Sequence, residues 1–335
     1  MSEITILNGL FIKLYSNKNF NTFKYSLLKA QEELDISGIY GIIYDDFDIK
    51  DELKKRWIKE YQDIKIFTVA RRRKTIRMDS KLLFANKMKE SIYTPVTYLK
   101  YEDIPVSTDK NTLFFVKKDG STGSKHVYIS KYQDLSNIIS NVDCSNEYIL
   151  QESMSDPDLY NEKRYKIRVH VILHNNEVYL HRKTFATVSS EKFSVGGFKD
   201  SLSGIKDIDL QKMNVICQAN SERFILYNEI DNYELIEENI ILALKDFKTY
   251  YTTEVNSIGS EEFSILGFDF VVDSNKNVNI IEINHRSNYH HNINKLMNDI
   301  LSSSSSIQND QSLIEKSFAS PLKEAREHFE KEYLM

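Results

Sequence analysis

The sequence predicts a mixed α+β fold in which antiparallel sheets dominate, and three hairpin patterns in the chain predict it. In each pattern two apolar or alternating runs of strand length flank a short polar turn or loop. Strands joined in this way pair antiparallel. The predicted strand pairs are 113–117 with 127–129, 165–173 with 178–185, and 263–272 with 278–284.

The first 75 residues have a different rhythm. Short apolar runs at 4–7, 39–44 and 64–69 alternate with polar stretches of helical character. This alternation predicts a small α/β lobe, and no glycine fingerprint for a dinucleotide accompanies it. We expect four regions: an N-terminal α/β lobe (1–75), a central lobe (76–150), a C-terminal lobe with a metal site (151–300), and a Ser-rich hinge with a C-terminal helix (301–335).

The segments between the hairpins carry further patterns. A helix is predicted from Asp79 to about Lys89, and Pro95 then forces an extended segment. We expect a helix near 131–140, a strand at 148–152 and two helices within 207–250.

Composition excludes several classes of protein. The chain is 41% hydrophobic and 28% charged, as in ordinary soluble proteins, and its net charge of -5 argues against a dedicated nucleic-acid binder. Its two cysteines, Cys144 and Cys217, form neither a metal motif nor a disulfide framework. With no leader pattern and no bilayer-length apolar run, we expect a cytoplasmic protein with no membrane contact.

The clearest chemical signal lies in the last hairpin. If 274–277 is a four-residue turn, Asp273 pairs with Val278, and counting back places Asp269 opposite Glu282. Alternation puts Asn284 on the same face as Glu282, with residues 281 and 283 toward the core. Facing carboxylates repel unless a cation or proton lies between them, and Mg²⁺ prefers oxygen ligands. The alternative is a solvent-exposed face that happens to carry acids.

Lysines near the first hairpin suit phosphate. Lys117 ends an apolar strand and precedes the loop 118–126, where glycines let backbone N–H groups approach an anion. Lys81 begins the helix that follows Asp79. An ordinary hairpin loop and a solvated lysine are the alternatives, because the pattern is neither a P-loop nor G-x-G-x-x-G.

Basic residues of the middle hairpin suit an anion. Lys166, Arg168 and His170 share one face of their strand. The turn at 174–177 places Lys183 opposite Arg168, with Arg182 adjacent, and facing cations are unfavourable unless an anion lies between them. A phosphate or a carboxylate would serve, and an exposed basic strand is the alternative.

Two other clusters consist of histidines and of basic residues. His285, His290 and His291 lack further zinc ligands. The basic run from Arg71 to Arg77 is ordinarily a solvated face, yet it suits an acidic peptide.

Taken in order, these pieces resemble the ATP-grasp superfamily and, within it, its tubulin tyrosine ligase-like branch. The resemblance covers about residues 79–290. It is carried by 114–117 with the following loop, by 149–157, by Arg164-Tyr-Lys-Ile-Arg168, by 178–182, and by Gly267-Phe-Asp269-Phe through Ile281-Glu282-Ile-Asn284.

The resemblance implies an ATP-grasp fold whose two lobes clasp ATP, and it implies site residues. Lys81 and Lys117 would contact the phosphates, and the loop with Ser121, Thr122, Gly123 and Ser124 would close over them. Gln151, Glu152 and Ser153 would form the hinge beside adenine. Asp269, Glu282 and Asn284 would hold two Mg²⁺ ions. Arg168, with Arg182 or Lys183, would act on the transferring phosphate or the acceptor.

The chain departs from the family pattern at three positions. Lys118 stands where proline is usual, Lys166 replaces an acid, and Thr187 stands where an arginine is usual on the substrate side. The implied activity is an ATP-dependent carboxylate–amine ligase that acts through an acylphosphate on an amino acid, peptide or small carboxylate, with tubulin in doubt as acceptor. A phosphotransferase on the same fold and a degenerate ATP-binding or peptide-binding module are the alternatives.

Overall fold

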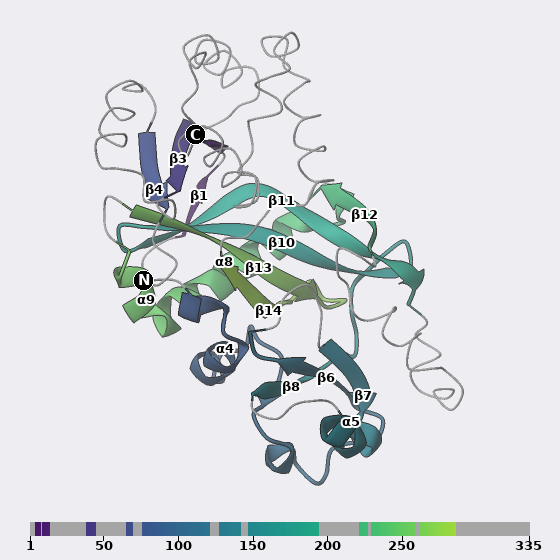
Figure 1. Cartoon of the computed structure of the whole chain (residues 1–335). Coiled ribbons are helices and arrows are strands. Elements are labelled where there is room, and N and C mark those ends of the chain that lie inside the picture. The colour runs from purple at the N-terminus through teal and green to yellow at the C-terminus, as the bar shows by residue number, and fades with distance from the viewer. Residues whose placement is uncertain are drawn as a thin grey trace, which may run out of the picture.

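The chain folds around two β-sheets in the computed structural model (Figure 1). The structure describes residues 4–7, 9–13, 38–44, 65–69, 76–120, 127–141, 147–193, 221–226, 229–258 and 262–285. Within these residues, the larger sheet has ten strands and the smaller has four. Most neighbouring strands run antiparallel, as the hairpin patterns predict.

The larger sheet is centred on two long hairpins. In the order β1-β11-β10-β13-β4-β3-β2, β10 lies between β11 and β13, and β14, β12 and β9 pair with β13, β11 and β10. The central strands are β10 (Lys163–His174), β11 (Glu177–Lys192), β12 (Ser221–Leu226), β13 (Glu262–Val272) and β14 (Val278–His285), with β9 (Leu159–Tyr160) at one end.

The N-terminal strands extend this same sheet. β2 (Gly9–Lys13), β3 (Gly38–Tyr44) and β4 (Lys65–Val69) pair in parallel, and β4 continues in parallel onto β13. β1 (Thr5–Leu7) pairs in parallel with β11. Parallel pairing agrees with the predicted α/β rhythm, but the strands join the sheet of the C-terminal region through their backbones. The division of the chain into four regions stays a prediction.

The smaller sheet has the order β5-β8-β6-β7. Its strands are β5 (Thr97–Tyr98), β6 (Leu113–Lys118), β7 (Val127–Lys131) and β8 (Tyr148–Glu152). Phe114, Val116 and Leu150 pack with Leu135 of α5 (Leu135–Asn141) in a core of their own. Short 3-10 turns lie at Tyr101–Asp103 and Tyr132–Asp134.

Helix α8 (Tyr233–Tyr250) covers the core of the larger sheet. Its residues Ile236, Ile240, Leu244 and Phe247 recur at helical spacing and are fully buried. Phe247 meets Phe268 of β13 edge to face, with ring centroids 4.8 Å apart. Helix α9 (Thr252–Asn256) follows directly, and α4 (Lys81–Lys87) comes after the 3-10 turn Ile76–Asp79.

One prediction of secondary structure is wrong in part. Residues 207–250 were expected to form two helices, and α8 occupies Tyr233–Tyr250, with residues 207–220 outside the described residues, but Ser221–Leu226 forms β12. The segment pairs with β11, so a neighbouring strand overrides its weak local preference. Within the described ranges, no helix is both long enough and apolar enough to span a bilayer.

Candidate active site

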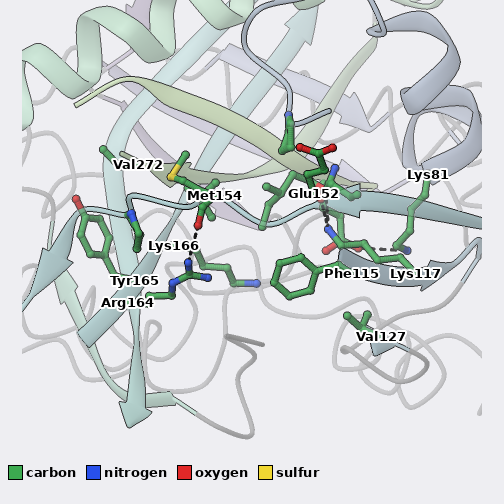
Figure 2. Close-up of a pocket in the computed structure, with 16 residues that line it drawn as sticks. Lys81, Phe115, Lys117, Val127, Glu152, Met154, Arg164, Tyr165, Lys166 and Val272 are labelled. Atoms are coloured by element: carbon green, nitrogen blue, oxygen red, sulfur yellow. Dashed lines mark hydrogen bonds and ion pairs between the residues drawn. The ribbon is translucent and has the colours of Figure 1, made fainter. Parts of the chain in front are cut away.

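A pocket lies between the two sheets and draws its walls from both (Figure 2). The smaller sheet contributes Phe115 and Lys117 from β6, and the larger sheet contributes Lys166 from β10 and Glu282 from β14. Figure 2 shows Lys81 and Lys117 at one end, with Arg164, Tyr165, Met154 and Val272 at the other. One end of the pocket therefore carries two lysines, and at the other end apolar side chains surround the guanidinium of Arg164.

Strand alternation aims Lys117 into this pocket. Phe114 and Val116 enter the core beneath the smaller sheet, so Phe115 and Lys117 face the other way. The Lys117 Nζ donates to Gln151 Oε1 at 2.5 Å and to the Ile281 carbonyl at 3.4 Å. Burial, together with the charges of Lys81 and Lys166, lowers the pKa of Lys117 to about 8 despite Glu282 and Asp269 nearby. A phosphate would stabilise its charged form.

Lys81 reaches the same end from helix α4. Ser80 caps this helix by accepting from the Leu83 N–H at 3.1 Å. Asp119, at the base of the glycine-rich loop, accepts from the Lys81 N–H at 2.6 Å and from Ser80 Oγ at 3.0 Å. The Lys81 Nζ lies 3.4 Å from Glu282 Oε1. Asp119 therefore ties the position of Lys81 to the strand that carries Lys117.

The last hairpin has the predicted pairing of Asp269 with Glu282, but it reaches this pairing by another route. The loop is one residue longer than predicted, so Val272 and not Asp273 pairs with Val278. Ile281 is then an extra residue on β14, between the pairs Phe270–Ile280 and Asp269–Glu282, and this β-bulge restores the register. The two deviations cancel. The bulge also turns Ile281, predicted to face the core, into the pocket wall, while Ile283 is buried as expected.

Asp269 is fully buried and held by two cations of β10. Lys166 Nζ and Arg168 Nη2 each donate to its Oδ2 at 2.8 Å, and Arg168 Nε donates to its Oδ1. Burial alone would raise the pKa of Asp269, but Arg168 and Lys166 outweigh it and hold the pKa well below its usual range. Burial likewise opposes the charge of Arg168, yet Asp269 and Glu282 raise its pKa above the ordinary value.

The anion that faces Arg168 is thus a carboxylate of the protein itself. Arg168 pairs with Asp269 across strands β10 and β13. The prediction that Lys183 lies opposite Arg168 is wrong, because an irregularity between Arg168 and His170 shifts the β10–β11 register and places Phe185 there. The side chains of Arg182 and Lys183 lie outside the described residues.

The remaining predicted residues divide into three groups. Gln151 and Glu152 line the pocket, and Ser153 follows them, with its N–H bonded to the Leu113 carbonyl. Asn284 does not line the pocket, and its Nδ2 donates to the Gly267 carbonyl at 3.5 Å. Outside the described residues lie Ser121, Thr122, Gly123 and Ser124, the side chains of 71–77 and His285, and His290, His291, Cys144, Cys217 and 301–335.

The chain matches one known protein family. The sequence profile of the tubulin-tyrosine ligase family matches residues 50–313, which is more than half of the chain. The chain belongs to the tubulin-tyrosine ligase family. Members of this family are ATP-dependent ligases with the ATP-grasp fold, typically using ATP and Mg²⁺. No protein among the curated ones matches the chain.

In this tubulin-tyrosine ligase family member, the pocket also contains Arg164, a residue to which the sequence alone gave no role. Arg164 is buried and lies against the ring of Phe193, 4.5 Å from its centroid. Its Nη2 donates to the Met154 carbonyl at 2.7 Å and its Nη1 to Ser153 Oγ at 3.4 Å. Burial lowers the pKa of Arg164 to about 10. Arg164 lies two residues before Lys166 on the same strand, so strand alternation could have predicted that both side chains face the pocket.

The two carboxylates of this family member differ in how well they suit Mg²⁺. Glu282 lines the pocket and keeps 28% of its side chain exposed, so it suits a hard cation shared with phosphate oxygens. Asp269 fits less well, since it is fully buried and both of its oxygens accept from cations. Among the described residues, no three His, Cys, Asp or Glu side chains gather into a metal cluster.

Proposed function

We propose that the chain is an ATP-dependent carboxylate–amine ligase that joins an amino acid or amine to a carboxylate of a peptide or small molecule. The observation that carries the proposal is the convergence of Lys81, Lys117 and Glu282 on one end of the pocket from three separate elements. Membership in a family of ATP-dependent ligases supports the reaction class.

The charges around the pocket suit a nucleotide. The positively charged side chains at the site outnumber its carboxylates; they are Lys81, Lys117, Lys166 and Arg168. The negative charge of a magnesium-bound triphosphate would offset this excess. The triphosphate would lie at the end with the two lysines, and the base would lie near Met154 and Val272 at the other. Gln151 and Glu152 line the pocket, and with Ser153 they would form the hinge beside the base.

The proposed chemistry has two steps. An oxygen of the substrate carboxylate attacks the γ-phosphorus, the bond to the β–γ bridging oxygen breaks, and ADP leaves. The amine nitrogen then attacks the acyl carbon, a C–N bond forms, inorganic phosphate leaves with the C–O bond electrons, and the amine proton passes to solvent. Phosphorylation is needed because a carboxylate carbon is a poor electrophile.

The residues of this chain position charge in both steps. Lys81 and Lys117 would hold the phosphates, and Arg168 would neutralise charge on the transferring group, with Arg182 or Lys183 toward the acceptor. Mg²⁺ would be held by Glu282 with Asn284, and it would supply further neutralisation of the phosphates.

Thr187 departs from the family pattern at a position that bears on the acceptor. Thr187 stands where an arginine is usual, is 3% exposed and pairs with Lys166 through the backbone. A buried threonine cannot bind a carboxylate as an arginine does. We therefore propose an acceptor other than tubulin, with an acidic peptide the first class to test.

The test is product analysis with a panel of amino acids and acidic peptides. A ligase releases ADP and free phosphate only when both a carboxylate and an amine are present, and it forms an amide. A phosphoester without free phosphate would instead identify a kinase, and no binding of Mg–ATP in calorimetry would identify a degenerate module.

A variant of Glu282 sharpens this test. Glu282→Gln removes the pocket carboxylate that pairs with Lys81 and is expected to lower turnover by roughly 100-fold or more, with an unchanged circular dichroism spectrum. The matched control is Glu238→Gln on the exposed face of α8, which should retain wild-type turnover. Wild-type activity in the Glu282 variant would contradict the assignment.

A further inference from the structure

The environment of Asp269 differs from that of its cross-strand partner Glu282. Although the two residues pair across β13 and β14, Asp269 has no exposed side-chain surface, whereas Glu282 opens into the pocket. Asp269 accepts three hydrogen bonds from Lys166 and Arg168. Glu282 forms an ion pair with Lys81 at the longer distance of 3.4 Å.

The contacts of Asp269 match those of a carboxylate that anchors cations of its own chain. Arg168 takes both oxygens through Nε and Nη2, which is the bidentate arrangement that fixes a guanidinium in place. Lys166 adds a second positive charge on Oδ2 at 2.8 Å. A divalent ion bound to the same oxygen would stand close to the Lys166 ammonium, and the two like charges would repel each other.

Lys166 also reaches the pocket. It lines the pocket wall beside Phe115 and Lys117 while its Nζ contacts Asp269. An ammonium has three N–H donors, so one bond to Asp269 leaves donors for phosphate oxygens in the pocket. Its backbone partner on β11 is Thr187, whose side chain is uncharged.

We infer that Lys166 is a built-in cation that replaces one of the two Mg²⁺ ions expected for this site, so that the chain binds ATP with a single divalent ion at Glu282. The inference rests on the proposed function. It makes Asp269 the anchor of Lys166 and Arg168, and it leaves Glu282 and Asn284 to hold the metal. Lys166 then neutralises phosphate charge at every Mg²⁺ concentration.

The test counts divalent ions directly. Mn²⁺ bound to the full-length protein with a saturating non-hydrolysable ATP analogue is measured by electron paramagnetic resonance, with free Mn²⁺ subtracted. We expect one Mn²⁺ per bound analogue in the wild type. In Lys166→Asp, which replaces the ammonium with a carboxylate, we expect two. Lys163→Met, on the same strand and outside the pocket lining, is the matched control and should keep one.

The outcomes separate this inference from the proposed function. Two Mn²⁺ per analogue in the wild type would overturn the single-ion site while leaving the ligase proposal intact. Analogue binding that fails altogether in the wild type would overturn both. The wild-type Mn²⁺ count alone tests the single-ion site, so the inference remains falsifiable even if Lys166→Asp does not fold. Lys166→Met gives a second variant, in which Arg168 still pairs with Asp269.

Discussion

Replacing Lys117 with methionine tests whether the pocket holds a charge that destabilises the ligand-free protein. Lys117 is 7% exposed, and burial lowers its pKa to about 8 from the ordinary value of 10.5. Since the pKa is lower in the folded state, the unfolded chain binds the proton more tightly and stability rises with pH between these two values. The charged form therefore opposes folding at neutral pH.

The magnitude follows from the shift. At about 1.4 kcal/mol per pKa unit, the buried charge lowers the free energy of unfolding by about 3 kcal/mol at pH 7 and by about 1 kcal/mol at pH 10. The variant loses the bond to the buried Gln151, which costs about 1 to 2 kcal/mol. We therefore expect Lys117→Met to be more stable than the wild type by roughly 1 to 2 kcal/mol at pH 7.

The assay is urea unfolding of both proteins at pH 7 and at pH 10. The stability advantage of the variant should fall by about 2 kcal/mol between the two, and this difference does not depend on the cost of the lost bond. In calorimetry the variant should no longer bind Mg–ATP tightly. A variant that is less stable than the wild type at pH 7, or an advantage that does not change with pH, would refute the reasoning.

Two further substitutions test the support of the pocket and the core. Asp119→Ala removes the acceptor for the Lys81 N–H and Ser80 Oγ, so we expect about 1 to 2 kcal/mol less stability and weaker binding of an ATP analogue in calorimetry. The exposed Asp103→Ala is the control, and equal analogue affinity in both variants would contradict the role of Asp119. Phe268→Ala, in the core against Phe247, should cost about 3 to 5 kcal/mol in urea unfolding, and a loss below about 1 kcal/mol would contradict the packing.

The sequence by itself determined the hairpins and the lysines of the pocket. Alternation in residues 165–173 places Ile167, Val169 and Val171 in the core, and all three are fully buried. The strand ending at Lys117 likewise aims this lysine at the pocket. These features follow from period-2 geometry within one strand, which local sequence specifies.

Only the tertiary structure decided which charges meet. The bulge in β14 and the register shift between β10 and β11 cannot be read from alternation, because an extra residue in one strand changes every pairing beyond it. For this reason Lys183 was wrongly placed opposite Arg168. Arg168 is neutralised by Asp269, which lies roughly a hundred residues later in the chain. The pairing of β10 with β13 brings the two side chains together.

The same reason limits what the sequence could say of the metal site. Asp269 and Glu282 look equivalent on one hairpin, and their pairing was predicted although the turn and the bulge were not. The two carboxylates differ in their surroundings. Lys166 and Arg168 of β10 enclose Asp269, whereas Glu282 opens toward Lys81 and the pocket. A carboxylate's chemistry depends on its burial and on the charges around it, and long-range strand pairing sets both.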